Sequence, residues 1–164
     1  QKLPESQMDR FMIRVTMGYP SVEDEVSIMK SKTGGLSNRV LSKNVINAQD
    51  FMAMRDIVDE VYVDDSIYEY VAKIVAKTRD SEDILQGISP RGSISIINMA
   101  KAEAFLRGHD YVLPSDIQFV LNDTMAHRII LNRSLKRGHI TEESVIDSIC
   151  RSVDVPKIGT RGIL

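Results

Sequence analysis

The feature that most constrains the fold of this chain is a long apolar segment between Gly87 and Val112 with a clear beginning and end. Ser89 is a good N-cap, and Pro90 suits the first helical position, where an N–H would lack a partner anyway. Gly108 stands where a left-handed residue ends a helix. Apolar residues occupy most faces of the helix in between, so we expect it to be buried among other helices. The sequence therefore predicts a mainly α-helical fold.

Arg91 is the one residue of this helix that its position does not favour. It lies in the first turn, where the helix dipole and the free N–H groups stabilise an anion and disfavour a cation. An arginine beside a helix N-terminus is well suited to hold a phosphate group. The alternative is a solvated or locally paired arginine, which is the common state of charged residues. From the residues alone both interpretations stay open.

The stretch GISPRGSISIINMAKAEAFLRGHDYVLPSDI resembles the lid-domain signature of the MoxR family of AAA+ ATPases. In that family the arginine of the S-P-R motif is the sensor-2 residue. The resemblance implies that Arg91 contacts the nucleotide phosphates, in its own subunit or in a neighbouring one. It also implies a helical lid domain, which is a helix bundle with a small β-ribbon.

A second motif lies near the beginning of the chain. LPESQMDRFMIRVTMGYPS resembles the MoxR segment in which the arginine of the D-R-F motif is the arginine finger. Arg10 is the matching residue, and the resemblance implies that it acts in trans on the nucleotide of the neighbouring subunit. A rigidly held guanidinium stabilises charge on the γ-phosphate and contributes about 10³–10⁵ in rate. The alternative is an exposed ion pair of Arg10 with Asp9 or Glu5, which would contribute about 0–1 kcal/mol.

Residues 3–9 are predicted to form a short helical turn, and residues 11–17 a strand because they are rich in apolar and β-branched side chains. With them, the resemblance gives the last helical turn and last strand of an α/β ATPase core in residues 1–20. A lid domain is then expected over residues 21–156, with a flexible tail over residues 157–164. No role is assigned to the connector at residues 36–45.

Five further helices follow from capping residues and apolar spacing. They are expected to begin at Ser21, at Asn47 or Ala48, at Asp64, at Pro114 and at Thr141. Residues 61–65 and 111–112 are candidates for a small β-ribbon, and residues 79–87 for an acidic solvated loop. His127 is interpreted as a structural histidine, since no second His or Cys lies at metal spacing. No role is assigned to Arg128, and no metal site is predicted.

Composition limits the classes of partner. The formal net charge of −2 provides no basic field for nucleic acid and no polybasic face for a membrane. The single Cys150 suits a reducing compartment. No apolar run approaches the roughly 20 residues that span a bilayer, and no signal peptide opens the chain, so we expect a cytoplasmic protein without direct membrane insertion.

Two features of an ATP-binding core are missing from the sequence. It has no G-x-x-x-x-G-K-[ST] loop for phosphates and no apolar strand that ends in paired acids for Mg²⁺. We therefore expect that the chain is the C-terminal part of a longer protein. We also expect that alone it neither hydrolyses ATP nor holds a tightly bound cofactor.

The resemblance implies a parent that uses ATP and Mg²⁺ and assembles into a homo-oligomeric ring, a hexamer. Its relatives remodel or mature partner proteins, including proteins with a von Willebrand factor A domain. Two alternatives stay open. One is the lid of a magnesium-chelatase-like or helicase-like AAA+ protein, although a helicase would be expected to have a basic groove. The other is a non-catalytic helical protein-interaction module.

Overall fold

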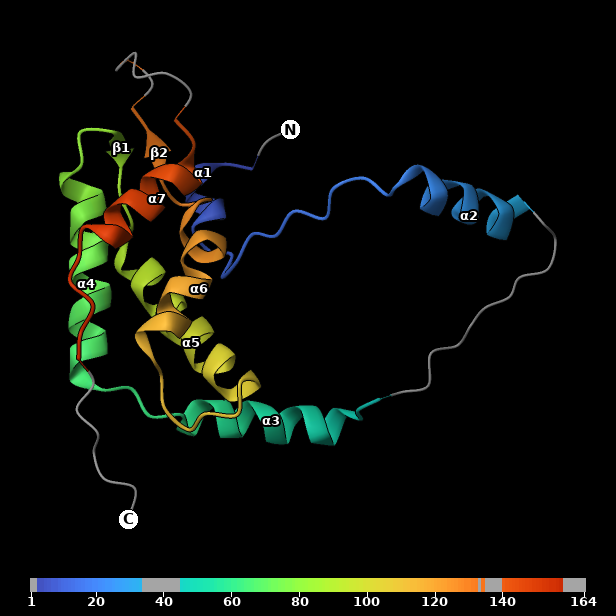
Figure 1. Cartoon of the computed structure of the whole chain (residues 1–164), viewed down its shortest axis with the longest axis horizontal. Coiled ribbons are helices and arrows are strands. Elements are labelled where there is room, and N and C mark those ends of the chain that lie inside the picture. The colour runs from blue at the N-terminus through green and yellow to red at the C-terminus, as the bar shows by residue number, and fades with distance from the viewer. Residues whose placement is uncertain (1–2, 34–44, 133, 135–139, 158–164) are drawn as a thin grey trace.

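The computed structural model describes residues 3–33, 45–132, 134 and 140–157. Helices dominate this part of the chain, as expected (Figure 1). The helices are α1 (Glu5–Met8), α2 (Val22–Thr33), α3 (Ala48–Glu60), α4 (Asp65–Asp80), α5 (Pro90–Leu106), α6 (Pro114–Met125) and α7 (Glu142–Arg151). The strands are β1 (Ile84–Gln86) and β2 (Ile130–Leu131). Apart from Val45 and Lys157, the connector at residues 36–45 and the tail at residues 157–164 lie outside the described residues.

The hydrophobic core lies among α4, α5, α6 and α7, with α3 packed against α5 at one end (Figure 1). Its fully buried side chains are aliphatic with one tyrosine and include Ile67, Ile74, Ile96, Ile117, Met125, Ile146 and Tyr70. The α4 face predicted from apolar spacing is buried as expected. Burial of such side chains contributes roughly 1.5–3 kcal/mol each. This apolar packing fixes the positions of the helix ends that carry the candidate site.

The predicted helix starts are found at their capping residues. The Asn47 side chain accepts the Asp50 amide at 2.8 Å, and Asp64 accepts the Ser66 amide at 2.9 Å. The Thr141 hydroxyl likewise accepts the Ser144 amide at 3.2 Å. Each of these bonds pairs an amide that a helix N-terminus leaves without an intrahelical acceptor. Gly108 ends α5 with a left-handed φ of 79°, as predicted.

Three expectations about the backbone are wrong. Residues 11–17 do not form a strand, because none of the described strands lies beside them to complete a ladder of hydrogen bonds. The ribbon of residues 61–65 and 111–112 reduces to one isolated parallel bridge between Tyr62 and Tyr111. The acidic loop at residues 79–87 instead contains the end of α4 and strand β1, which pairs antiparallel with β2.

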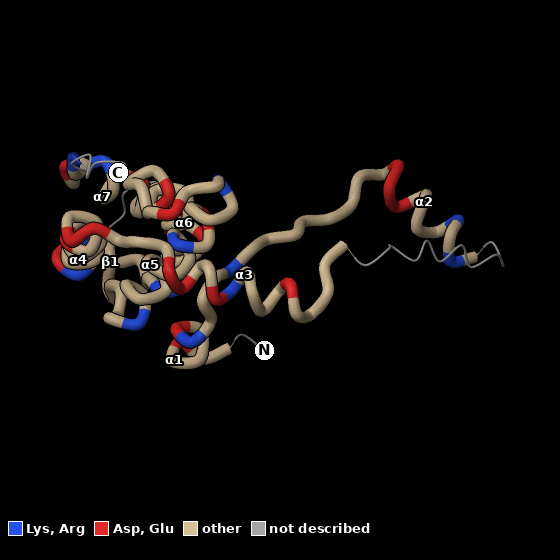
Figure 2. Tube along the Cα trace, turned by 90° about the horizontal axis from the view of Figure 1, so that it is seen from below, with Lys and Arg blue, Asp and Glu red and all other residues tan. Residues whose placement is uncertain are grey.

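The outer helices differ from the core helices in burial. α2 lies apart from the other helices in both views, and none of its residues is buried (Figures 1 and 2). α5 was predicted to be buried on most faces, but Ile94 and Leu106 are exposed. Tyr70 of α4 is buried and accepts a hydrogen bond from Gln118 at 3.1 Å. Within the described residues, no helix combines the length and apolarity needed to cross a bilayer.

Candidate functional site

Arg10 follows the short helix α1 and is exposed to solvent. Its backbone is held in the turn by a hydrogen bond from its amide to the Gln7 carbonyl at 3.0 Å. Among the described residues its side chain has no ion pair, and the carboxylate of Asp9, one of its two partners in the alternative interpretation, contacts other residues. An exposed guanidinium without a carboxylate partner can bind an incoming phosphate group.

Arg91 occupies the first turn of α5, directly after Pro90 at the first helical position, and is also exposed. In the described part of the chain, no carboxylate forms an ion pair with its side chain. No acidic residue lies in the first turn of α5. The first turn of this helix therefore combines the positive end of the helix dipole with a cation that has no ion pair in the described residues, which favours an anionic ligand.

A hydrogen bond links the segment of Arg10 to the helix of Arg91. The Ser89 hydroxyl, at the N-cap of α5, donates to both oxygens of the Asp9 carboxylate at 3.0 and 3.1 Å. Ser89 was predicted to cap α5, and it stands at the N-cap position, but its side chain makes no capping bond there. Each predicted arginine thus lies within two residues of this hydrogen bond, Arg10 after Asp9 and Arg91 after Ser89.

Arg128 lies beneath this link and is the residue that sequence reasoning missed. Its side chain is 1% exposed and forms an ion pair with Asp9, with 3.2 Å between Nε and Oδ1. Burial lowers the pKa of Arg128, and the Asp9 carboxylate opposes that shift. An arginine remains charged even so, because the guanidinium group does not lose its proton in proteins. The signal available in the sequence was an arginine three residues after the end of α6 at Met125, which apolar spacing alone does not mark as buried.

His127 supports the same segment, as a structural histidine. Its Nε2 lies 2.9 Å from the Phe11 carbonyl oxygen and donates to it, while Nδ1 is buried without a hydrogen-bond partner among the described residues. Burial lowers the pKa of His127, and the nearby Arg128 and Arg14 act in the same direction. The ring is therefore held in its neutral form, with the proton on Nε2.

A bound ATP with Mg²⁺ requires cations for its phosphate oxygens and oxygen ligands for its metal ion. Two exposed arginines without ion-pair partners suit the phosphate oxygens of a nucleotide. No group of three or more His, Cys, Asp or Glu residues in the described ranges is placed to hold a metal ion. The described residues thus offer two exposed cations that suit phosphate oxygens and no cluster that suits a metal ion.

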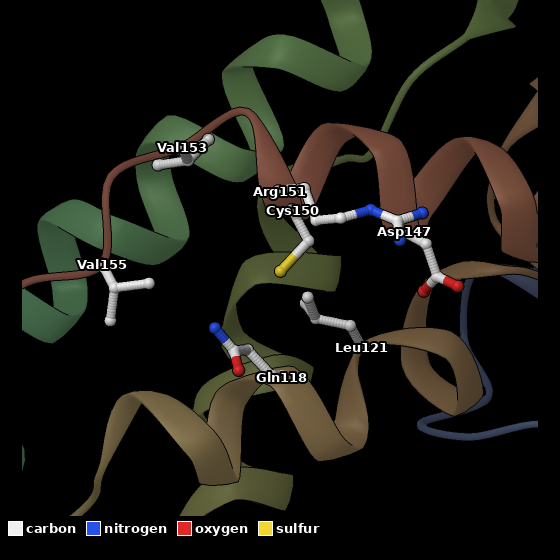
Figure 3. Close-up of a pocket in the computed structure, with 7 residues that line it drawn as sticks. All are labelled: Gln118, Leu121, Asp147, Cys150, Arg151, Val153 and Val155. Atoms are coloured by element: carbon white, nitrogen blue, oxygen red, sulfur yellow. The ribbon is translucent and has the colours of Figure 1, made fainter.

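A separate cavity of about 430 Å³ lies between α6 and α7 (Figure 3). Its walls are Gln118, Leu121, Asp147, Cys150, Arg151, Val153 and Val155. The Cys150 thiol points toward Gln118 in Figure 3, and its sulfur lies 3.6 Å from the Tyr70 hydroxyl. Burial raises the pKa of Tyr70 to about 12. None of the lining residues is among those that contact Arg128, so the cavity is distinct from the arginine site.

Comparison with known proteins finds a lid-domain family and two bacterial relatives that the chain resembles along nearly its whole length. Residues 76–149 match the model of the AAA lid domain, which spans α5, α6 and most of α7. The chain is 39% identical to the uncharacterized protein YeaC of Bacillus subtilis over 94% of its own length and 48% of that protein. It is 32% identical to the chaperone MoxR1 of Mycobacterium tuberculosis over 95% of its own length and 43% of that protein.

The fold is also similar to a solved structure. The crystal structure of a presumed ATPase from Cytophaga hutchinsonii aligns with a TM-score of 0.80 at 31% identity. The alignment covers 96% of this chain and 50% of that protein. The chain thus spans about half the length of the relatives that it matches.

Proposed function

Because this chain belongs to the MoxR-type AAA+ proteins, we propose that it works as the lid-bearing part of an ATP-hydrolysing ring. The observation that carries the proposal is the pair of exposed arginines, Arg10 and Arg91, on two segments that Asp9 and Ser89 bond together. In this proposal the parent hydrolyses ATP, uses Mg²⁺ and remodels or matures partner proteins in a chaperone-like way, consistent with the name of the mycobacterial relative.

Arg10 is proposed to be the arginine finger. It would reach the nucleotide of the neighbouring subunit and stabilise the charge that develops on the transferred phosphoryl group. Its exposure and its lack of an ion-pair partner in the described residues support this role, because a guanidinium paired with Asp9 or Glu5 would have to break that pair first. The turn that carries Arg10 is fixed to the lid through Asp9, which supplies the rigid mounting that the role requires.

Arg91 is proposed to be the sensor-2 residue, which contacts the nucleotide phosphates from the first turn of α5. ATP would supply the phosphoryl group and Mg²⁺ its charge neutralisation, and this chain would supply only the two cations. A change at the phosphates would move α5 and the helices packed against it, α3, α4 and α6, as a rigid body.

The ring, a hexamer of identical subunits, and a partner that contains a von Willebrand factor A domain are parts of the same proposal. The proposal also includes a cytoplasmic location and the division of the chain into the end of an ATPase core (residues 1–20), a lid domain (residues 21–156) and a tail (residues 157–164). The formal net charge of −2 provides no basic field for a nucleic acid, which supports a protein client. The same observation makes a helicase-like relative the weaker of the alternatives.

Rings of mixed composition test the trans role of Arg10. Wild-type and Arg10→Ala subunits of the full-length protein would be mixed at varied ratios, and steady-state ATP hydrolysis would be measured at fixed total protein. Each Arg10→Ala subunit would disable the nucleotide site of its neighbour. A site that receives Arg10 from a wild-type subunit should keep its ATPase activity, and a site that faces an Arg10→Ala subunit should lose it. Wild-type subunits should therefore become less active, per subunit, as the fraction of Arg10→Ala rises.

The matched control is Arg55→Ala, which removes an exposed arginine from α3. Mixed rings that contain it should keep the wild-type rate at every ratio. If wild-type subunits kept their full activity beside Arg10→Ala subunits, Arg10 would not act across a subunit interface. If no hydrolysis by the full-length protein were found under conditions in which it assembles, the non-catalytic interaction module would be the better description.

A further inference from the structure

Arg128 contacts the backbone on both sides of Arg10. Its Nη2 donates to the carbonyl oxygens of Asp9 and Phe11, at 3.2 and 2.8 Å. Its Nη1 donates to the Met12 carbonyl at 3.2 Å, and its Nε donates to the Asp9 carboxylate at 3.2 Å. One buried guanidinium therefore holds the chain immediately before and after the proposed finger.

The same guanidinium is fixed to the lid helices. Nη2 also donates to the Ser95 hydroxyl of α5 at 3.0 Å, and Nη1 donates to the Thr124 carbonyl of α6. Gly92, in the first turn of α5, allows this approach, because a Cβ there would meet Ile88 Cγ2 and would lie 3.3 Å from Arg128 Cδ. The Arg128 side chain thus contacts α5 and α6 on one side and residues 9–12 on the other.

Apolar packing contributes little to the position of this segment. Phe11 and Met12 are 53% and 45% exposed, and no residue of α1 is buried. The contacts that hold the segment are therefore mainly polar and converge on Arg128, with His127 and Ser89 beside it. Only a planar group with five N–H donors can serve so many acceptors together, so lysine would not be an equivalent residue here.

We propose that Arg128 is a positioning residue for Arg10: it fixes the backbone of Arg10 relative to the first turn of α5, so that Arg10 and Arg91 move as one rigid unit. The inference rests on the proposed roles of these two arginines. It adds a mechanical consequence, which is that a movement of the lid driven at Arg91 also moves the finger that faces the neighbouring subunit.

The first test is kinetic and uses the full-length protein. Arg128→Lys keeps the positive charge but loses the planar fork, so we expect the kcat of ATP hydrolysis to fall about tenfold or more, with KM changed much less. In an Arg10→Ala background the same substitution should lower kcat no further, because Arg128 would act through Arg10. Arg107→Lys is the matched control, since Arg107 pairs with Glu103 and Asp116 near the opposite end of α5.

The second test needs neither nucleotide nor activity. In the 164-residue chain, hydrogen exchange would be followed at the amides of Arg10, Phe11 and Arg14, which donate to Gln7, Met8 and Asp123. Arg128→Lys should speed exchange at these three amides by tenfold or more and leave the amides of α4 and α7 protected. If Arg128→Lys fails to fold, Asp9→Asn removes the charge of the same contact and should shift the same amides in the same direction.

The outcomes separate the inference from the function on which it rests. An unchanged kcat in Arg10→Ala would overturn the proposed finger role and the inference with it. If Arg10→Ala is impaired, an Arg128→Lys protein with wild-type kcat and exchange would overturn the positioning role alone. So would a kcat loss that adds in full to that of Arg10→Ala, because the substitution would then act by a general loss of structure.

Discussion

At the scale of single residues, the three arginines of the candidate site lie in different environments. Arg10 and Arg91 are exposed, whereas Arg128 is buried with acceptors around its whole guanidinium. Asp9 was a candidate partner for Arg10, but its carboxylate accepts from Arg128 and Ser89. The exposed cations are available for a phosphate, and the buried one is committed to structure.

His127 gives a prediction about pH. Because burial lowers its pKa in the folded chain, the unfolded chain binds more protons between that pKa and the ordinary value of about 6.5. The contribution of His127 to the free energy of unfolding is therefore complete above about pH 7 and is lost as the pH falls. We expect urea unfolding of the wild-type chain to show this loss.

His127→Gln is the matched variant, since a glutamine amide can donate to the Phe11 carbonyl in place of Nε2 but does not titrate. Its free energy of unfolding should fall less between pH 7 and pH 5 than that of the wild type. Parallel curves for the two proteins would show that His127 does not titrate on unfolding, which contradicts a buried neutral ring.

At the scale of elements, apolar spacing and capping residues predicted the helices well, because both signals are local. Ser21, Asn47, Asp64 and Thr141 stand at the expected starts. The buried face of α4 follows the predicted apolar spacing, but it also includes Tyr70. The strand β1 was missed because its three residues pair with β2, more than forty positions away. The expected strand at residues 11–17 failed for a related reason, since a strand requires a partner that local sequence does not specify.

The candidate site divides in the same way. Arg10 and Arg91 were named from motifs, whereas the contacts of Arg128 with residues 9–12 join positions about 116 to 119 apart in the sequence. No periodicity or spacing rule reports such a contact. A buried arginine is identified only when the fold shows which carbonyl groups surround it.

Gly92 provides a prediction about the junction of α5 with Arg128. Gly92→Ala would place a methyl group against Ile88 and close to the Arg128 side chain. Overpacking of this kind costs about 1–3 kcal/mol, partly offset by the roughly 1 kcal/mol gain in helix propensity. We expect a net lower free energy of unfolding by urea denaturation, with faster hydrogen exchange at residues 10–14.

The control for this substitution is Ser93→Ala in the same helical turn, which adds no atom. It should change the free energy of unfolding by no more than about 0.5 kcal/mol. A Gly92→Ala variant as stable as the wild type, with unchanged exchange at residues 10–14, would show that the close contact of α5 with Arg128 does not constrain the junction.

At the scale of the whole molecule, the core of α4 to α7 accounts for the fold, while α1, α2 and α3 contribute no buried residues. α2 and α3 carry exposed apolar residues, such as Val22 and Phe51. Such residues suit a surface against which other parts of a ring would pack. The two proposed phosphate-binding cations, Arg10 and Arg91, are exposed, and among the described residues no cluster that would hold a metal ion is found.

It follows that the 164-residue chain alone should not hydrolyse ATP. Two arginines without a phosphate-cradling loop or metal ligands cannot orient the γ-phosphate for transfer. Phosphate release from ATP and Mg²⁺ should stay at the level of a buffer control at all protein concentrations. Turnover that co-purifies with the folded chain through successive columns, and is absent from a mock preparation, would contradict this expectation.

The central claim is that Arg10 and Arg91 are the nucleotide-contacting residues of this chain. Its most direct test is steady-state ATP hydrolysis by the full-length protein as wild type, Arg10→Ala, Arg91→Ala and the Arg55→Ala control. We expect each of the first two substitutions to lower the rate tenfold or more, which is roughly 1.4 kcal/mol or more of barrier, and the control to leave it unchanged. If folded Arg10→Ala and Arg91→Ala proteins keep the wild-type rate, both arginines are surface residues without a catalytic role.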